Sequence, residues 1–352
     1  MDNFFKIKNR ELSEREQEIL RSIINLYILK ASPVGSRSLS KYLEDKLNLS
    51  AASLRNIMSD LEEMDYISHP HTSAGRIPTD KGYRFYVDSL SNFNSSENDI
   101  ITINQSIIIE GNDNDQIFKE ATKVLGALSQ YLSVIKIPQI LDIKVQKMQL
   151  ISLASTRLLV VLALDSNIVR TVTLEADFEF NTKYLDKISN YINERVSGKS
   201  LRFLRENFAE LVSEMGYREY PLIRLFVDSV DKIFDTAQDK DKIVTSGTQN
   251  LINHPEFDVL SKVKSVIELV ENEDIIVHLL DNFGEINNGI KVMIGSEMDN
   301  TIMDDYSIIL SSYSLGNAIG TIGVIGPKRM NYSRMINLVQ GVSSIISTQQ
   351  KN

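Results

Sequence analysis

Apolar residues recur with a helical period through the first ninety residues of the chain. Ser13 and Glu16 stand at the start of the first such segment, in the spacing of a capping box, in which each side chain bonds the backbone amide of the other residue. The apolar positions that follow lie on one face of a helix: Ile19, Leu20, Ile23, Ile24, Tyr27 and Ile28. Ser32 and Pro33 stop the pattern, so we predict an amphipathic helix from Ser13 to about Lys30.

Two shorter helices are predicted next. The first runs from about Ser36 to Leu43, and the second follows the N-cap residue Ser50, with a turn through Asn48 between them. The second of them has a buried apolar stripe: Leu54, Ile57, Met58, Leu61 and Met64. Three helices in this order, with a tight connection before the last, are typical of a helix-turn-helix.

A β-hairpin and a fourth helix complete this N-terminal region. Residues 66–69 and 76–78 predict two short strands, and the polar stretch 70–75 predicts the turn of a wing between them. Thr79 and Asp80 then cap a helix whose apolar face comprises Tyr83, Tyr86, Val87 and Leu90. The pattern therefore predicts a winged helix-turn-helix domain.

Beyond a linker rich in Ser and Asn, the pattern changes to mixed helix and strand. Helical periodicity covers residues 117–132, 183–195, 259–271 and 334–347. Apolar strands are predicted over residues 147–154, 158–164, 168–174, 275–280, 290–294, 306–313 and 318–325. Residues 197–248 are mostly helical and interrupt this alternation, so we predict that they form an insertion.

Composition narrows the class of protein. A length of 352 residues favours two or three domains, and the absence of cysteine excludes disulfides and thiolate chemistry. The N-terminus does not resemble a signal peptide and the apolar runs are too short to span a bilayer, so we expect a cytoplasmic protein without a membrane partner. Of the net charge of −9, none arises in residues 1–90, which hold 13 Lys and Arg against 13 Asp and Glu.

The third helix carries the candidate DNA-reading residues. If it enters a major groove, the residues beside or opposite its apolar stripe face the bases: Ser50, Ala52, Ser53, Arg55, Asn56 and Ser59. Asn56 suits adenine and Arg55 suits guanine, because each offers a bidentate contact. The alternative is that both are ordinary solvated helix residues.

Five cations are the candidate phosphate contacts: Arg37, Lys41, Arg76, Lys81 and Arg84. Such contacts position a protein on the duplex and carry little sequence information. Because the region is neutral overall, we expect its acidic residues Glu44, Asp45, Glu62 and Glu63 to point away from the DNA. The alternative is a solvated surface of mixed charge.

No catalytic, metal or cofactor site is predicted. The chain has no phosphate-binding loop and no hydrolase or kinase motif, and we interpret His69, His71, His254 and His278 as exposed or structural residues. The glycines at 316, 320, 323 and 326 lack the dinucleotide-binding spacing, and we interpret them as bends in a curved sheet.

Four segments carry a resemblance to a known family. Residues 73–84, SAGRIPTDKGYR, closely resemble the wing and the following helix of the HrcA family of bacterial heat-inducible transcription repressors. Residues 15–27, 250–257 and 325–332 agree with the same family. The resemblance implies a GAF-like domain and a helical dimerisation domain inserted into it.

Pattern and resemblance together predict an α+β multidomain protein. Residues 1–90 form the winged helix-turn-helix domain and residues 91–104 the linker. Residues 105–196 and 249–348 form a GAF-like α/β domain with an antiparallel sheet, and residues 197–248 form the inserted dimerisation domain. An extra layer of intramolecular core is the alternative for this apolar insertion.

The resemblance also implies a function. Members of the family repress chaperone operons by binding, as homodimers, an inverted-repeat operator called CIRCE in double-stranded DNA, and the chaperonin GroEL helps them to reach the active form. Heat relieves this repression. The alternatives are a regulator that senses a small molecule through the GAF-like domain and, with no supporting motif, an enzyme.

Overall fold

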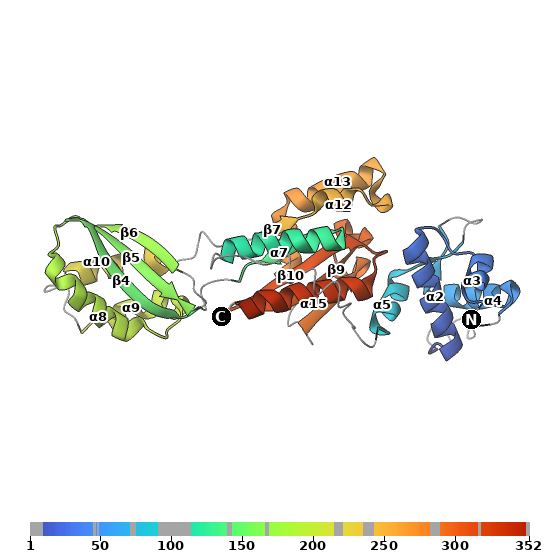
Figure 1. Cartoon of the computed structure of the whole chain (residues 1–352), viewed down its shortest axis with the longest axis horizontal. Helices are drawn as coiled ribbons and strands as arrows, with labels where there is room; N and C mark the ends of the chain where they lie inside the picture. The colour runs from blue at the N-terminus through green and yellow to red at the C-terminus, as the bar shows by residue number, and fades with distance from the viewer. Residues whose placement is uncertain are drawn as a thin grey trace.

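The computed structural model describes residues 10–44, 47, 49–70, 75–90, 114–138, 143–165, 169–214, 221–234, 243–281, 289–315 and 318–349. These residues form three units in a row (Figure 1). The head, residues 10–90, lies at one end, the central unit is built on a five-stranded sheet, and the inserted unit, with a three-stranded sheet, lies at the other end. No helix in these ranges combines the length and apolar character needed to cross a membrane.

The head has the predicted winged-helix elements. They are α2 (Glu14–Lys30), α3 (Ser36–Tyr42), α4 (Ala51–Glu63), β1 (Ile67–Ser68), β2 (Ile77–Pro78) and α5 (Asp80–Asp88). The capping box of Ser13 and Glu16 is present, and Thr79 Oγ1 accepts a hydrogen bond from the Gly82 amide at 3.1 Å. The predicted starts of α2, α4 and α5 are confirmed, and each has a capping side chain, from Ser13, Ser50 and Thr79 respectively.

Two contacts hold the helix-turn-helix and the wing together. Ser40 Oγ donates to the Leu49 carbonyl at 3.0 Å, which fixes the turn between α3 and α4. Val34 and Arg76 exchange two backbone hydrogen bonds of 2.8 Å, so the segment before α3 is joined by a single bridge to the residue that precedes β2.

The central unit is a five-stranded antiparallel sheet with the strand order β7-β3-β10-β9-β8. The strands are β3 (Leu132–Lys136), β7 (Ile243–Ser246), β8 (Ile290–Ile294), β9 (Tyr306–Leu315) and β10 (Ala318–Pro327). Successive residues of a strand face opposite sides of the sheet. Accordingly, Ile308 and Leu310 belong to one core and Ile309 to another.

Helices cover both faces of this sheet. On one face lie α7 (Asn114–Ser129) and α15 (Tyr332–Gln349) (Figure 1). On the other lie α12 (Thr248–Ile252), η5 (Pro255–Phe257), α13 (Leu260–Glu271) and α14 (Glu273–Asp281). The short helices η7 (Gly295–Met298) and η8 (Thr301–Asp305) connect β8 to β9.

The inserted unit has its own sheet and core. Its strands are β4 (Val145–Ala154), β5 (Arg157–Leu164) and β6 (Val169–Glu175), in the order β4-β5-β6. Its helices are η3 (Thr182–Tyr184), α8 (Leu185–Val196), α9 (Leu201–Leu211), α10 (Pro221–Asp228) and α11 (Val230–Phe234). One core joins the sheet to these helices through residues such as Met148, Leu162, Ile192, Leu204 and Phe226.

The limits predicted for the insertion, 197–248, therefore differ from the structure. The strands of residues 145–175 share the core of the helices instead of joining the central sheet. Residues 243–246, predicted to be part of the mostly helical insertion, form strand β7, which pairs with β3 of the central sheet. Strand periodicity identifies strands but does not say which sheet they join. The predicted linker, 91–104, lies outside the described residues.

Two further predictions are corrected, and one glycine interpretation changes. Residues 275–280, predicted as a strand, belong to helix α14. Leu132, predicted as the end of a helix, is the first residue of strand β3. Short apolar runs are compatible with either element, because periodicity alone does not distinguish them. The glycines from 320 to 326 lie within β10 as expected, but close packing is what requires Gly320, because a Cβ there would lie 2.3 Å from the Tyr313 ring.

Candidate nucleic-acid interface

Helix α4 presents a polar face at the outer side of the head. Leu54, Met58 and Leu61 are buried, and Ile57 is partly buried. The opposite side is exposed and consists of Ala52, Arg55, Asn56 and Ser59. Their spacing of three and four residues places them on adjacent turns. The structure thus brings together four of the predicted reading residues.

Two more predicted residues lie at the start of this helix. Ser50 Oγ accepts a hydrogen bond from the Ser53 amide at 3.1 Å, and the two hydroxyls lie 3.0 Å apart. Ser50 is exposed and Ser53 partly buried. Both hydroxyls therefore lie at the N-terminus of a helix, which is a favourable place for a phosphate.

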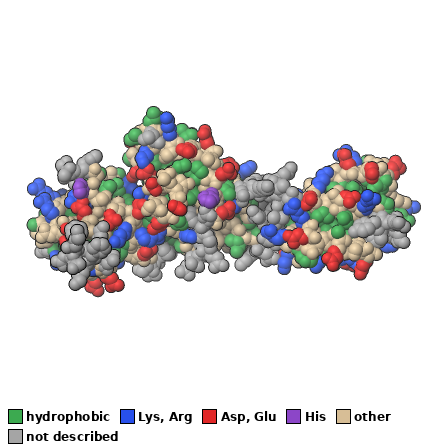
Figure 2. All heavy atoms as spheres, turned by 180° about the vertical axis from the view of Figure 1, so that it is seen from behind, with side chains coloured by type: hydrophobic (Ala, Val, Ile, Leu, Met, Phe, Trp, Pro, Cys, Tyr) green, Lys and Arg blue, Asp and Glu red, His purple; other side chains and the backbone are tan. Residues whose placement is uncertain are grey.

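Three exposed cations of α3 and α4 have no acidic partner in the described structure. Arg37 and Lys41 are exposed one turn apart on α3, and Arg55 is exposed on α4. Among the residues that the structure describes, none of the three has an ion-pair partner. Figure 2 shows Lys and Arg side chains at the outer end of the head. Asp60 and Glu63 are also exposed on α4, toward its C-terminal end, so the cations lie nearer its start.

Arg76 is held by an acidic residue. Its guanidinium contacts Glu62 Oε2 at 2.8 Å from Nε and 2.7 Å from Nη2. The other oxygen of Glu62 contacts the ring of His69. Glu62, expected to point away, therefore neutralises a predicted phosphate contact. The wing residues 71–74, with His71, lie outside the described residues.

Lys81 is bound to the end of the reading helix. Its ammonium donates to the Met64 carbonyl at 2.8 Å and lies 4.4 Å from the centre of the Tyr66 ring. A cation at a helix C-terminus stabilises the last carbonyls. This contact fixes α5 against α4, while the side chain remains exposed.

Arg84 lies away from the reading face. Its Nε donates to Glu297 Oε1 at 2.7 Å, and its Nη2 donates to the Val292 carbonyl at 2.8 Å and to the other Glu297 oxygen. Helix α5 lies on the side of the head that meets the central unit (Figure 1). The structure therefore places this predicted DNA contact in the junction between the two units.

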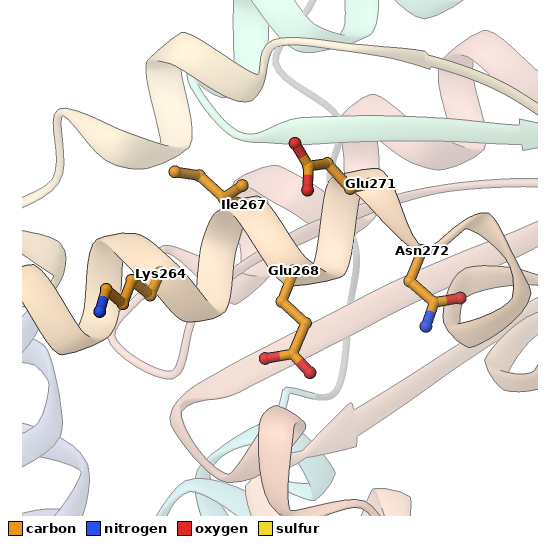
Figure 3. Close-up of a pocket in the computed structure, with 5 residues that line it drawn as sticks. All are labelled: Lys264, Ile267, Glu268, Glu271 and Asn272. Carbon is orange, nitrogen blue, oxygen red and sulfur yellow. The ribbon is translucent and has the colours of Figure 1, made fainter.

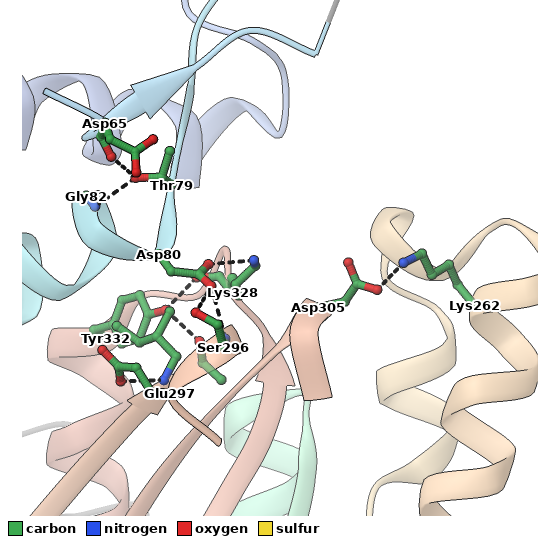
Figure 4. A network of polar contacts seen from close by, with 12 residues as sticks. Asp65, Thr79, Asp80, Gly82, Lys262, Ser296, Glu297, Asp305, Lys328 and Tyr332 are labelled. Carbon is green, nitrogen blue, oxygen red and sulfur yellow. Dashed lines mark hydrogen bonds and ion pairs between the residues drawn. The ribbon is translucent and has the colours of Figure 1, made fainter. Parts of the chain in front are cut away.

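The same junction contains residues that sequence analysis missed. Asp80 Oδ1 accepts from Lys328 Nζ at 2.6 Å, and Oδ2 accepts from the amide and hydroxyl of Ser296 at 3.0 and 2.9 Å (Figure 4). Burial raises the pKa of Asp80, but these hydrogen bonds outweigh it and leave the pKa below its ordinary value. In the sequence, Asp80 is explained by its place in the first turn of a helix, where a carboxylate is favourable. No local pattern indicated that it contacts Lys328.

His254 and a hollow on α13 lie outside the head. His254 stacks on Tyr131 at 4.8 Å and its Nε2 lies 2.9 Å from the Gln130 carbonyl. A hollow of about 470 Å³ on α13 is lined by Lys264, Ile267, Glu268, Glu271 and Asn272 (Figure 3). With one aliphatic side chain in its wall, it does not have the apolar lining typical of a small-molecule site.

A winged helix with an exposed polar recognition face, joined to an α/β body, defines a DNA-binding transcription regulator. Residues 11–89 match the family model described as "Winged helix-turn-helix transcription repressor, HrcA DNA-binding", and residues 115–336 match "HrcA protein C terminal domain". The chain belongs to the HrcA family of heat-inducible transcription repressors.

Two repressors of this family match nearly the whole chain. The chain is 36% identical to the "Heat-inducible transcription repressor HrcA" of Chlorobium phaeobacteroides (strain BS1), covering 96% of this chain and 98% of the relative. It is 34% identical to the protein of the same name from Ruminiclostridium cellulolyticum, covering 96% and 97%. A structure described as "Crystal structure of a hypothetical protein at 2.2 A resolution" has a TM-score of 0.63 at 24% identity, covering 96% and 98%, and so supports the fold.

Proposed function

We propose that this protein represses heat-shock chaperone operons by occupying a CIRCE-type inverted repeat in double-stranded DNA as a homodimer, and that heat relieves the repression. The observation that carries the proposal is the exposed face of α4, which includes Arg55, together with the exposed Arg37 and Lys41 on the adjacent helix α3; none of the three cations has an ion-pair partner in the described structure. A dimer is needed because an inverted repeat presents its half-sites with two-fold symmetry.

The residues of this face have distinct roles in the proposal. Asn56 and Arg55 read base edges, while Ala52 allows close approach to a thymine methyl and Ser59 bonds a base or phosphate. Ser50 and Ser53 at the helix start, together with Arg37 and Lys41, bind phosphates. Lys81 stabilises the C-terminal end of α4. Arg76 exchanges its ion pair with Glu62 for a phosphate when DNA binds.

For the body of the protein, we propose a GAF-like central unit and dimerisation through the inserted unit. Helices cover one side of the β4-β5-β6 sheet, and the other side carries apolar residues in contact with solvent. Ile151 is 46% exposed and Val169 64% exposed, and Leu159 lies opposite Ile151 in the register. An open apolar face of this kind is typical of an interaction surface.

The chaperonin GroEL is the proposed partner in activation. In this scheme, GroEL brings newly made or unfolded repressor to the form that binds the operator. Unfolded protein produced by heat competes for the chaperonin, so the amount of active repressor falls and transcription of the chaperone operons rises.

A salt-controlled titration tests the DNA-binding part. The protein, with and without GroEL, is titrated against a CIRCE-type inverted repeat and against a scrambled duplex of the same composition. We expect preference for the repeat that is lost in Asn56→Ala and retained in Arg224→Ala, an exposed residue of the inserted unit. Equal, weak binding of both duplexes in the presence of GroEL would contradict the proposal.

Sedimentation tests the dimer. Ile151→Lys places a charge on the open sheet face, and Glu206→Lys places one on an exposed position of α9, on the covered side of the sheet. We expect the first variant to sediment as a monomer and the second as a dimer. Two dimeric variants would mean that another surface joins the protomers.

A further inference from the structure

Arg84 joins the head to the exposed edge of the central sheet. Strand β8 is at the end of the strand order, so its outer carbonyl groups have no partner among the described strands. Arg84 Nη2 satisfies one of them at Val292, and the same guanidinium binds both oxygens of Glu297. Glu297 also accepts a hydrogen bond from the Ile294 amide at 2.9 Å, which holds its carboxylate in place.

Asp80 forms a second polar contact one turn earlier on α5. Its three acceptor contacts reach two separate segments of the central unit: Ser296 in η7, and Lys328 after β10. Figure 4 shows these side chains converging on the first turn of α5, with Tyr332 directly beside them. The contacts therefore fix both the position and the rotation of this helix.

An apolar contact lies beside the polar ones. The ring of Tyr332, at the start of α15, lies 5.9 Å from the Tyr83 ring and 6.4 Å from the Tyr86 ring, measured between centroids. Tyr332 and Tyr83 are almost completely buried. The head and the central unit consequently share one continuous core cluster.

A third contact holds a different helix of the head. Arg329 donates from Nη1 to the Ile28 carbonyl in the last turn of α2 at 2.8 Å, and its Nε is paired with Glu256. A cation there also complements the negative end of the helix dipole. Because α2 and α5 are both attached, rotation of the head about either helix would break contacts at the other.

We propose that Arg84 and Asp80 are positioning residues, which hold the head in one orientation on the central unit so that the two heads of a dimer match a single spacing of operator half-sites. Arg84 then acts through Glu297 and does not bind phosphate. The spacing part of this inference rests on the proposed function, because it requires a dimer on an inverted repeat. The orientation part rests on the contacts alone.

The orientation is measured first, without DNA. The chain contains no cysteine, so a pair of introduced cysteines provides the only labelling sites. Spin labels at Asp60→Cys in the head and Lys264→Cys in the central unit, both exposed, report the distance between the units, with unlabelled protein added to dilute distances between protomers. We expect a narrow distribution that broadens in Arg84→Gln, in Glu297→Gln and in Asp80→Asn.

Binding is then measured on a series of inverted repeats that differ in the length between half-sites, and on a single half-site. We expect each of the three variants to lose about tenfold affinity for the best-spaced repeat and to distinguish the spacings less, because a tethered second contact depends on geometry. Half-site affinity and the salt dependence of binding should remain those of the unchanged protein. Arg224→Gln, which removes an exposed pair in the inserted unit, is the matched control.

The Glu297 variant decides between positioning and direct binding. If Arg84 bound phosphate, Arg84→Gln would weaken binding to every duplex, half-site included, and reduce the salt slope by about one, whereas Glu297→Gln would not. That result, or an unchanged distance distribution in all three variants, would overturn the inference. Failure of the unchanged protein to prefer any repeat would instead count against the proposed function, and the distance measurement would still decide the role of Arg84 and Asp80.

Discussion

The carboxylate of Asp80 occupies the space that a side chain at Gly295 would need: a Cβ built on Gly295 would lie 2.4 Å from Asp80 Oδ2. Gly295 has a φ of 48°, in the left-handed region that other residues rarely adopt. Gly295 is therefore required for two reasons: its backbone adopts a left-handed conformation, and the carboxylate of Asp80 from the head packs directly against it. Residues 215 positions apart in the chain are fitted to each other at this point.

Replacing that glycine should weaken the attachment of the head. Gly289→Ala is a matched control, because Gly289 has a φ of 77° and no atom near its Cβ position. We expect the control to lower the free energy of unfolding by about 1 kcal/mol through backbone strain. Gly295→Ala should cost about 1–2 kcal/mol more through disturbed hydrogen bonds to Asp80. Equal losses in denaturant titrations would show that Asp80 moves aside freely.

Base reading by α4 should be separable from phosphate binding. Asn56→Ala and Arg55→Ala should each cost about 1–3 kcal/mol of operator affinity and relax the preference at one base pair. Arg37→Ala should instead weaken binding to all sequences and lower the salt slope by about one. Titrations against a set of single-base operator variants at several salt concentrations measure both effects. A uniform loss in Asn56→Ala would contradict its role in base reading.

Tyr332→Phe should destabilise the protein although the ring is kept. The hydroxyl donates to the Lys328 carbonyl at 2.7 Å and accepts from Ser307 at 2.8 Å, and the side chain is fully buried. Its loss leaves buried polar groups without a partner, which costs about 1–3 kcal/mol. Tyr184→Phe, at a residue that is 53% exposed, should change thermal stability little. A Tyr332→Phe protein as stable as this control would contradict the expectation.

Acid should weaken the head through Glu16. Hydrogen bonds from Arg10 and Ser13 outweigh burial and lower the pKa of Glu16 to about 2 from an ordinary value of 4.5. A lowered carboxyl pKa stabilises the folded state above the ordinary value, and this contribution is lost as pH falls toward 2. Because Arg10 is partly exposed, we expect Glu16 to contribute about 1–2 kcal/mol to the free energy of unfolding at neutral pH.

Glu16→Gln should therefore be less stable at neutral pH and less sensitive to pH between 4.5 and 2, as followed by helix content during chemical unfolding. Glu14→Gln, in the same first turn but exposed, is the control and should retain the pH dependence of the unchanged protein. A Glu16→Gln variant with the same acid sensitivity as this control would show that other carboxylates dominate.

Several features of the head could be predicted because their causes are local. Ser13, Ser50 and Thr79 begin helices by accepting a hydrogen bond from the amide three residues further on. The stripe of Leu54, Met58 and Leu61 left Arg55 and Asn56 exposed, as predicted from periodicity. Whether these exposed residues read DNA stays a prediction.

By itself, the sequence determined the helices and wing of the head, the polar face of α4 and most strands of the body, because each depends on the order of neighbouring residues. Only the tertiary structure decided that β4 to β6 form a separate sheet, and that Arg84 is bound to Glu297, 213 residues away. The physical reason is that local periodicity specifies which face of an element is apolar but not its partner. That choice depends on the packing of the whole chain.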